Sequence, residues 1–149
     1  LMVAIIVRAI SLVLVGLAGL AAGLAFIEER SVESIRQHET ALTARLIAGL
    51  RAIPGIGILG TADAARQTAV VSFNLDGWSC SEVASALEEN AGICCRAGLH
   101  CAPLAHRQLG TFPEGAVRFS LGLFNTESDV TTALDALREL AAHPKGAQT

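Results

Sequence analysis

The feature that most constrains this chain is an almost unbroken apolar stretch at its start. Residues 1–27 contain only Arg8 and Ser11 as polar side chains. As a helix rising about 1.5 Å per residue, the stretch would extend roughly 40 Å, enough to cross a hydrocarbon core of about 30 Å. Against a membrane span, Arg8 would cost about 2.5–3.5 kcal/mol near the bilayer centre, and the small-residue cleavage site typical of a signal peptide is missing. The sequence therefore predicts an apolar helix over 1–28 that is buried in protein or at an interface, with a membrane span as the alternative.

Residues 29–149 are long enough to form one compact domain with its own core. The formal net charge is −3, and Lys145 is the sole lysine, so the chain has no basic stripe of the kind that binds nucleic acid. Four cysteines, of which Cys94 and Cys95 are adjacent, do not resemble the disulfide framework of a secreted domain. We expect a protein of the reducing cytoplasm that does not bind nucleic acid.

The pattern of apolar residues predicts alternating helices and short strands in this second part. Ser79 with Glu82, and Thr126 with Asp129, have the spacing of capping boxes that begin helices. Helices are expected over about 31–50, 79–90 and 126–142, and strands near 56–59, 69–75, 93–95 and 116–121. Residues 96–114 are expected to be a long irregular segment. The predicted fold class is α+β, with a small, mainly antiparallel sheet packed with helices, preceded by the long apolar helix.

Cys101 is the candidate nucleophile. It lies in the predicted irregular segment, with Arg96 five residues before it, His100 adjacent and His106 five residues after. Cationic or protonatable neighbours favour the thiolate form of a cysteine, which is the reactive form. The alternative is a structural cysteine, the interpretation we prefer for the remaining three. We expect Cys101 to be exposed because its segment is rich in glycine and proline.

The same segment also raises the alternative of a zinc site, because cysteine and histidine are usual ligands of zinc. Cys95, His100, Cys101 and His106 do not have the paired spacing of zinc ribbons or fingers. The sequence therefore predicts no metal site.

Arg118 is the second candidate site residue. The strand predicted at 116–121 alternates, with Val117 and Phe119 on one side and Arg118 on the other. A guanidinium on a strand can hold a carboxylate by two parallel hydrogen bonds and so orient an amino acid. The alternative is a surface salt bridge.

These residues lie within longer runs that resemble a known family. The runs are Arg96-Ala-Gly-Leu-His-Cys-Ala-Pro-Leu-Ala-His106, Phe112-Pro-Glu-Gly115 and Val117-Arg-Phe-Ser-Leu-Gly-Leu-Phe-Asn-Thr126. They resemble the C-terminal small domain of class V aminotransferase-fold enzymes, in the branch of the cysteine desulfurases, which are fold-type I enzymes dependent on pyridoxal phosphate. Weaker similarity extends back to about residue 16.

The resemblance implies specific roles. Cys101 would take the sulfur of L-cysteine as a persulfide while alanine is released, and Arg118 would hold the substrate carboxylate. Arg96 matches the loop arginine of the family motif and would contribute to substrate binding by positioning or by placing charge near the thiolate. His100 and His106 are possible supporting residues. The family is implied to be homodimeric and to pass sulfur to an acceptor protein.

The same resemblance implies that this chain cannot bind the cofactor alone, because the family holds pyridoxal phosphate by a lysine in a large domain. Lys145 lies in the C-terminal tail, so the chain is expected to be a fragment, inactive without a large domain in cis or in trans. Two alternatives remain open. One is the small domain of another class V aminotransferase or C–S lyase, and the other is a non-catalytic domain, anchored in a membrane or bound to a partner through the apolar helix.

Overall fold

The computed structural model describes residues 2–143, and the chain divides by its contacts into two units, Leu1–Gln37 and His38–Thr149. The first unit holds helix α1 (Met2–Arg30) and the first turns of helix α2 (Val32–Arg51). Ser31, between the two helices, has a positive φ of 62°, and its hydroxyl accepts a hydrogen bond from the amide of Ser34. Ser31 therefore begins α2, as the sequence predicts.

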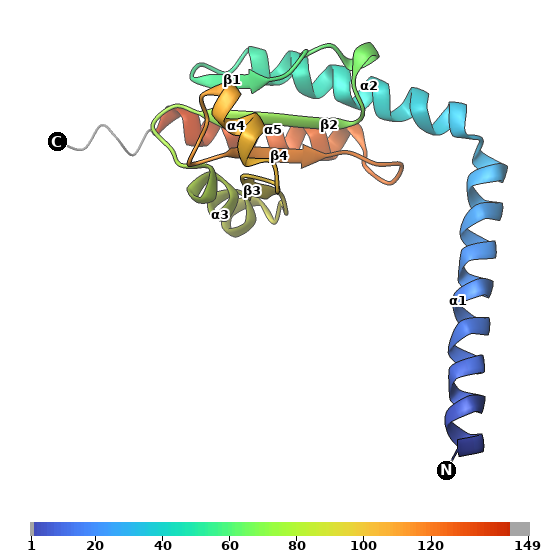
Figure 1. Cartoon of the computed structure of the whole chain (residues 1–149). Coiled ribbons are helices and arrows are strands. Elements are labelled where there is room, and N and C mark those ends of the chain that lie inside the picture. The colour runs from blue at the N-terminus through green and yellow to red at the C-terminus, as the bar shows by residue number, and fades with distance from the viewer. Residues whose placement is uncertain (1, 144–149) are drawn as a thin grey trace. The chain divides into compact units, whose positions relative to one another are not determined.

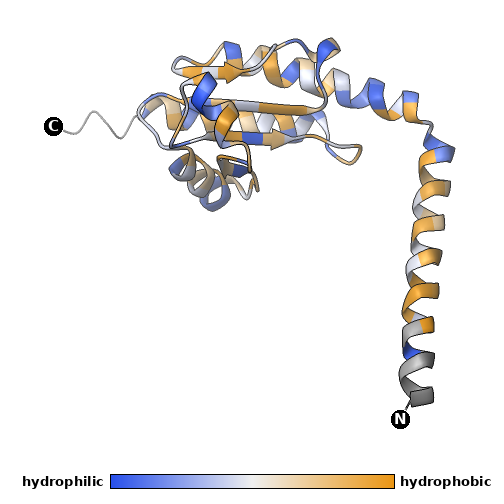
Figure 2. Cartoon of the chain, in the orientation of Figure 1, coloured by the Kyte–Doolittle hydropathy of each residue, from blue (hydrophilic) through white to orange (hydrophobic). Residues whose placement is uncertain are grey.

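Between Arg8 and Ile27, helix α1 is apolar except for Arg8 and Ser11 (Figure 2). The span Ile10–Arg30 contains an 18-residue window with a mean hydropathy of 2.5 and is long enough to cross a membrane by length and composition. Large side chains there are exposed, among them Leu12 at 74% and Val15 at 72%. The predicted apolar helix is confirmed.

The second unit is built on a four-stranded antiparallel sheet with the order β1-β2-β4-β3 (Figure 1). The strands are β1 (Ile56–Leu59), β2 (Val70–Leu75), β3 (Arg96–Gly98) and β4 (Ala116–Ser120). The helices are α2, a short 3-10 helix η1 (Ala64–Arg66), α3 (Cys80–Ala91), α4 (Pro103–Leu109) and α5 (Glu127–Ala142). This arrangement confirms the predicted α+β class with a small antiparallel sheet.

One face of the sheet carries the core. Alternate residues of β2 and β4 point into it, and Phe73 meets Phe119 edge to face with ring centroids 5.1 Å apart. Helices α2, α3 and α5 cover this face with the buried side chains Leu42, Leu46, Ile47, Leu50, Val83, Leu87, Val130, Leu134 and Leu137. Burial of this apolar surface is the main stabilising contribution to the fold. The predicted capping boxes at Ser79 and Thr126 both form.

Two predictions about local structure are wrong. The strand expected at 93–95 lies at Arg96–Gly98 instead, because its ladder is set by pairing with Ala116–Arg118. The segment expected to be irregular from Arg96 to Glu114 contains that strand and helix α4, which begins with Pro103 at its first turn and ends at Gly110. The tail predicted to be unstructured from His143 onward falls, beyond that residue, outside the described part of the chain.

Candidate functional site

The candidate site lies on the face of the sheet opposite the core. Residues of β2 and β4 that alternate with the core positions point to this face, which α4 borders while α5 lies on the other side (Figure 1). Ser72 and Asn74 of β2, Arg118 of β4 and Arg96 of β3 share it. The prediction that Arg118 faces away from the core is confirmed.

Arg96 and Arg118 lie directly opposite each other in the β3–β4 ladder, and Ser72 is opposite Arg118 on its other side. Directly opposed side chains have Cβ atoms about 4.5–5.5 Å apart, and like charges at such positions repel. In the described part of the chain, the ion pairs are formed by Arg45 and by Arg138, so neither of the two opposed arginines has a carboxylate partner there. A surface salt bridge therefore does not explain Arg118. Two arginines at opposed positions without a carboxylate partner have the chemistry to bind an anion.

Cys101 lies in a tight turn that leads from β3 to α4. The amide of Ala102 donates to the carbonyl of Leu99 at 2.8 Å, and both central residues have a positive φ, 50° at His100 and 61° at Cys101. Residues other than glycine rarely adopt this conformation, which costs of order 1–3 kcal/mol each and is found most often at functional sites. The turn leaves Cys101 exposed, as predicted.

His100 fastens this turn to the strand that carries Arg118. Its Nε2 lies 3.0 Å from the carbonyl oxygen of Ala116, two residues before Arg118. Burial lowers the pKa of His100; the hydrogen bond to the Ala116 carbonyl opposes this shift, and the charges of Arg118 and Arg96 add to it. The imidazole is therefore neutral near pH 7, and Nε2 carries the proton that it donates to the carbonyl.

A backbone contact between Gly98 and Gly115 also holds this region together. A Cβ built on Gly115 would lie 2.2 Å from the carbonyl carbon of Gly98, so these two glycines bring the backbones of β3 and β4 into close approach. Gly115 also has a φ of +88°. Together with the His100 bond, this contact fixes the start of the Cys101 turn relative to Arg118.

His106 supports the far end of the same segment from α4. It is 6% exposed, and its Nδ1 lies 2.7 Å from the hydroxyl of Thr111, whose amide donates to the carbonyl of His106. The rings of His100 and His106 lie 6.1 Å apart. The two predicted supporting residues are thus on either side of Cys101 and hold the segment in place.

The other three cysteines differ in solvent exposure. Cys80 is buried, as expected of a structural cysteine, and its thiol donates to the carbonyl of Glu114. Cys95 is half-buried, and burial together with neighbouring Cys94 and Glu88 raises the pKa of its thiol. Cys94 is exposed, so the expectation that it is a buried structural residue is wrong. Among the residues that the structure describes, no group of histidine, cysteine and acidic side chains could hold a metal ion.

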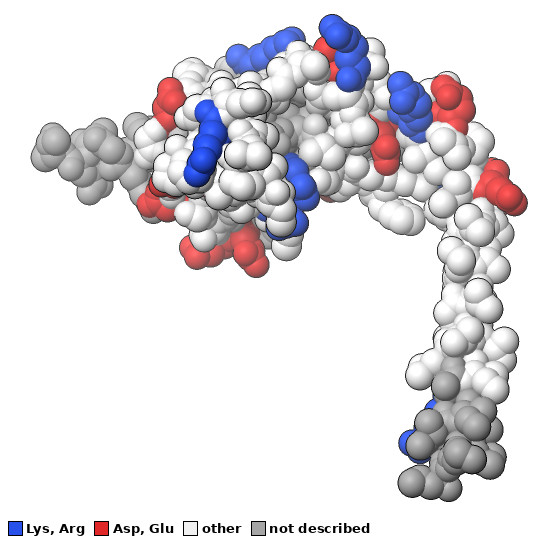
Figure 3. Space-filling view, in the orientation of Figure 1, with Lys and Arg blue, Asp and Glu red and all other residues white. Residues whose placement is uncertain are grey.

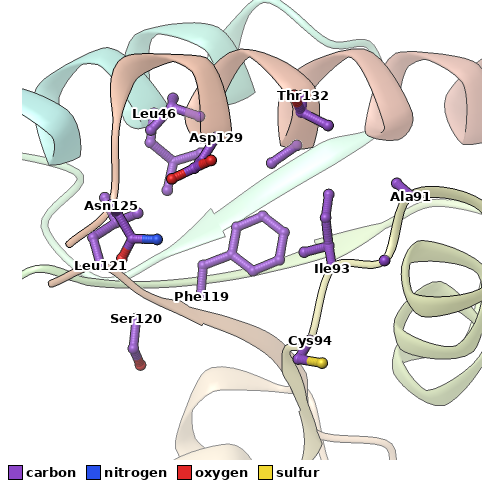
Figure 4. A pocket seen from close by; sticks show the side chains of 13 residues that line it. Leu46, Ala91, Ile93, Cys94, Phe119, Ser120, Leu121, Asn125, Asp129 and Thr132 are labelled. Atoms are coloured by element: carbon purple, nitrogen blue, oxygen red, sulfur yellow. The ribbon is translucent and has the colours of Figure 1, made fainter.

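A separate cavity of about 320 Å³ lies on the helix side of the sheet (Figure 4). Its lining is mainly apolar and includes Leu46, Ile93 and Phe119, with Asp129 at α5. None of the predicted site residues lines it. The carboxylate of Asp129 is occupied in the cap of α5, where hydrogen bonds from Thr126 lower its pKa.

Charge on the visible surface is mixed, since Figure 3 shows basic and acidic side chains interspersed. The positive charge of the candidate site comes from two residues, Arg96 and Arg118, at opposed positions of β3 and β4.

Sequence reasoning missed two polar members of this face, Ser72 and Asn74. The signal was present, because both alternate with the apolar residues of β2 and so share a face with Arg118. What the sequence does not show is which strands are neighbours.

Comparisons with known proteins identify the family of this chain. The sequence profile of the aminotransferase class-V family matches residues 8–132. The chain is 39% identical over 122 residues to a probable cysteine desulfurase of Pseudomonas putida and 42% identical over 126 residues to one of Pseudomonas aeruginosa. In both cases the match covers 82% of this chain and 29% of the relative.

Solved structures give the same result. A cysteine desulfurase from Thermococcus onnurineus, in its apo form, superposes with a TM-score of 0.78 at 33% identity, covering 83% of this chain and 30% of that one. A cysteine desulfurase from Escherichia coli superposes with a TM-score of 0.72 at 26% identity and covers 83% of this chain and 29% of its own. The chain thus spans about 30% of the length of these four relatives. It belongs to the aminotransferase class-V family, and its relatives are cysteine desulfurases.

Proposed function

We propose that this chain is the small C-terminal domain of a pyridoxal-phosphate-dependent cysteine desulfurase. The observation that carries the proposal is the placement, on one face of the sheet, of an anion site formed by Arg96 and Arg118 beside an exposed cysteine in a strained turn. L-Cysteine has both groups that these features require, a carboxylate for the arginines and a sulfur atom for the thiolate of Cys101. Cys101 receives that sulfur as a persulfide, and L-alanine is released.

The arginine pair selects and orients the substrate. A bidentate bond from a guanidinium to a carboxylate fixes the direction of the amino acid as well as its position. Arg118 is half-buried and held in a strand, so it is the principal clamp, and the more exposed Arg96 adds charge from the neighbouring strand. Binding of the carboxylate also relieves the repulsion between the two arginines.

The residues of this chain do not fit pyridoxal phosphate by themselves. The cofactor is held through a lysine, and the described part of the chain contains none, since the sole lysine is Lys145. We propose that a large domain, in cis or in trans, supplies the lysine and the phosphate site. The described residues of the second unit, 38–143, supply the nucleophile and the anion site.

The proposal is tested in a chimera in which this chain replaces its matched region in the Pseudomonas putida relative. The chimera should release L-alanine from L-cysteine, and Cys101→Ser should abolish that release. Cys94→Ser is the matched control, because Cys94 is also exposed but lies outside the site, and it should leave the rate unchanged. Equal alanine release by the Cys101→Ser chimera would show that the thiol is not the sulfur carrier and would favour an aminotransferase or C–S lyase.

We also propose that helix α1 packs against the rest of a complete, cytoplasmic and homodimeric enzyme. The family profile begins at residue 8 and so includes the apolar helix, which supports a role for this helix in the family's own fold. If instead the chain inserts into lipid, its complete protein should sediment with membranes and resist extraction by alkaline carbonate. Recovery of the protein in the soluble fraction, without detergent, would exclude the membrane-anchored alternative.

A sulfur-acceptor protein is expected to approach the exposed Cys101.

A further inference from the structure

Three buried polar atoms near the candidate site lack a hydrogen-bond partner among the described residues. They are Oδ1 of Asn74, Nδ1 of His100 and Nε of Arg118. A buried polar atom without a partner is rare in a folded protein, and an ordered water molecule is the usual explanation. Because the three atoms come from three separate segments around one site, a single bound water could satisfy all of them.

The three side chains lie along one short stretch of the chain, residues 115–118. The side-chain amide of Asn74 donates to the carbonyl of Gly115, and His100 bonds to the carbonyl of Ala116. Arg118 is two residues further along the same strand and on the same face. In the β2–β4 ladder Phe73 pairs with Val117, so Asn74 comes opposite Ala116 and is a diagonal neighbour of Arg118, at about 7–8 Å between backbones. Such a distance is too long for direct backbone contact but suits side chains that share a water.

The hydrogen-bonding roles of the three atoms are fixed by their other bonds. Nδ2 of Asn74 must be the donor to Gly115, which leaves Oδ1 as an acceptor. Nε2 of His100 must carry the proton donated to Ala116, and because the imidazole is neutral, Nδ1 is left as an acceptor. Nε of Arg118 is always a donor. One donor and two acceptors are the complement of one water molecule, which donates twice and accepts from the third group.

We propose that a single buried water joins Asn74, His100 and Arg118, and that Asn74 and His100 thereby position Arg118 for the substrate carboxylate. The water accepts from Nε of Arg118 and donates to Oδ1 of Asn74 and Nδ1 of His100. Because Nε is then occupied, the two terminal nitrogens of the guanidinium are left to face an anion. The water also connects the arginine to the turn that holds Cys101, so the anion site and the nucleophile share one support.

The water itself is tested in the full chain, independently of any activity. A high-resolution crystal structure should show one ordered solvent peak within about 3.2 Å of all three atoms. A direct bond from Arg118 to Asn74 or His100, or a site without solvent, would overturn the proposal. A ¹⁵N-histidine spectrum of the same chain should show His100 protonated at Nε2, and protonation at Nδ1 would equally refute it.

The positioning role rests on the proposed function and is tested in the chimera. Asn74→Leu keeps the size of the side chain but removes both its acceptor and its bond to the carbonyl of Gly115. It should raise the KM for L-cysteine about tenfold, equivalent to roughly 1.4 kcal/mol, with a smaller change in kcat. Asn90→Leu, the same change at an exposed position of α3, is the control and should leave KM unchanged.

The two hypotheses fail in different ways. If Arg118→Gln raises KM but Asn74→Leu does not, the positioning role is wrong while the proposed function stands. If Arg118→Gln itself leaves KM unchanged, the proposed function is wrong.

Discussion

The close approach of β3 and β4 at Gly98 and Gly115 predicts an unusually large effect of one methyl group. In Gly115→Ala the new Cβ would lie 2.2 Å from the backbone of Gly98, and backbone atoms cannot swing aside as a flexible side chain can. Overpacking of this kind costs about 1–3 kcal/mol. Placing alanine at a φ of +88° adds about 1–2 kcal/mol. The free energy of unfolding should therefore fall by about 2–5 kcal/mol, a large fraction of the about 5–15 kcal/mol typical of a domain.

Gly110→Ala is the matched control. Gly110 ends α4 with a φ of +73°, but a Cβ there would have nothing within 4 Å. This variant should lose only the backbone contribution of about 1–2 kcal/mol. The difference between the two variants then isolates the contact with Gly98.

Urea unfolding of the full chain, followed by fluorescence of the lone tryptophan, measures this difference. Trp78 is half-buried and its Nε1 donates to the carbonyl of Leu140 at 3.2 Å, so its emission reports the packing of α5. With a typical urea slope of about 2 kcal/mol per molar, Gly115→Ala should unfold at roughly 1 M less urea than Gly110→Ala. Equal midpoints would refute the inference that β3 and β4 are in backbone contact at this point.

Three further predictions concern the core, a helix cap and a titrating residue. Phe73→Ala removes a fully buried ring that packs edge to face on Phe119, and should lower the free energy of unfolding by about 3–5 kcal/mol; a loss below 1 kcal/mol in the urea assay would contradict its central position. Ser79→Ala removes the hydroxyl that accepts from the amide of Glu82, and should cost about 1 kcal/mol, whereas Ser79→Asp should retain most of the stability. Because the folded pKa of His100 is below its unfolded value of about 6.5, the unfolded state takes up the proton first as the pH falls, so stability should decrease on acidification below that value. His100→Gln should reduce this dependence, and an unchanged pH profile of the unfolding free energy would disprove it.

Local patterns were sufficient to predict most of the second unit. The alternation in β2 and β4 and the two capping boxes act over a few neighbouring residues, so they can be read directly from the sequence. The long apolar helix follows in the same way from composition alone.

Short elements and neighbouring strands could not be predicted from local patterns. Strand β3 has three residues, too few to show an alternation, and its position is set by a backbone contact between Gly98 and Gly115. Helix α4 has seven residues, fewer than an isolated helix needs, although Pro103 and Gly110 mark its two ends.

The same limit applies to the site. Cys101 and Arg118 could be singled out by residue type and context, and the resemblance to a family supports both. Strand order and register decide that Arg118 is opposite Arg96. They also decide that Asn74 and His100 bond to the adjacent carbonyls of Gly115 and Ala116. Those relations arise only when distant segments pair.

The central claim is that Cys101 carries the sulfur removed from L-cysteine, and mass mapping of the chimera after turnover tests it most directly. Trypsin cleaves after Arg96 and Arg107, so the peptide of residues 97–107 contains Cys101 as its sole cysteine, while Cys94 and Cys95 fall in the preceding peptide. After incubation with L-cysteine and trapping by an alkylating reagent, the account predicts one additional sulfur atom on the 97–107 peptide, removed by a reducing agent. An unmodified 97–107 peptide, with the additional sulfur on the peptide that contains Cys94, would contradict it.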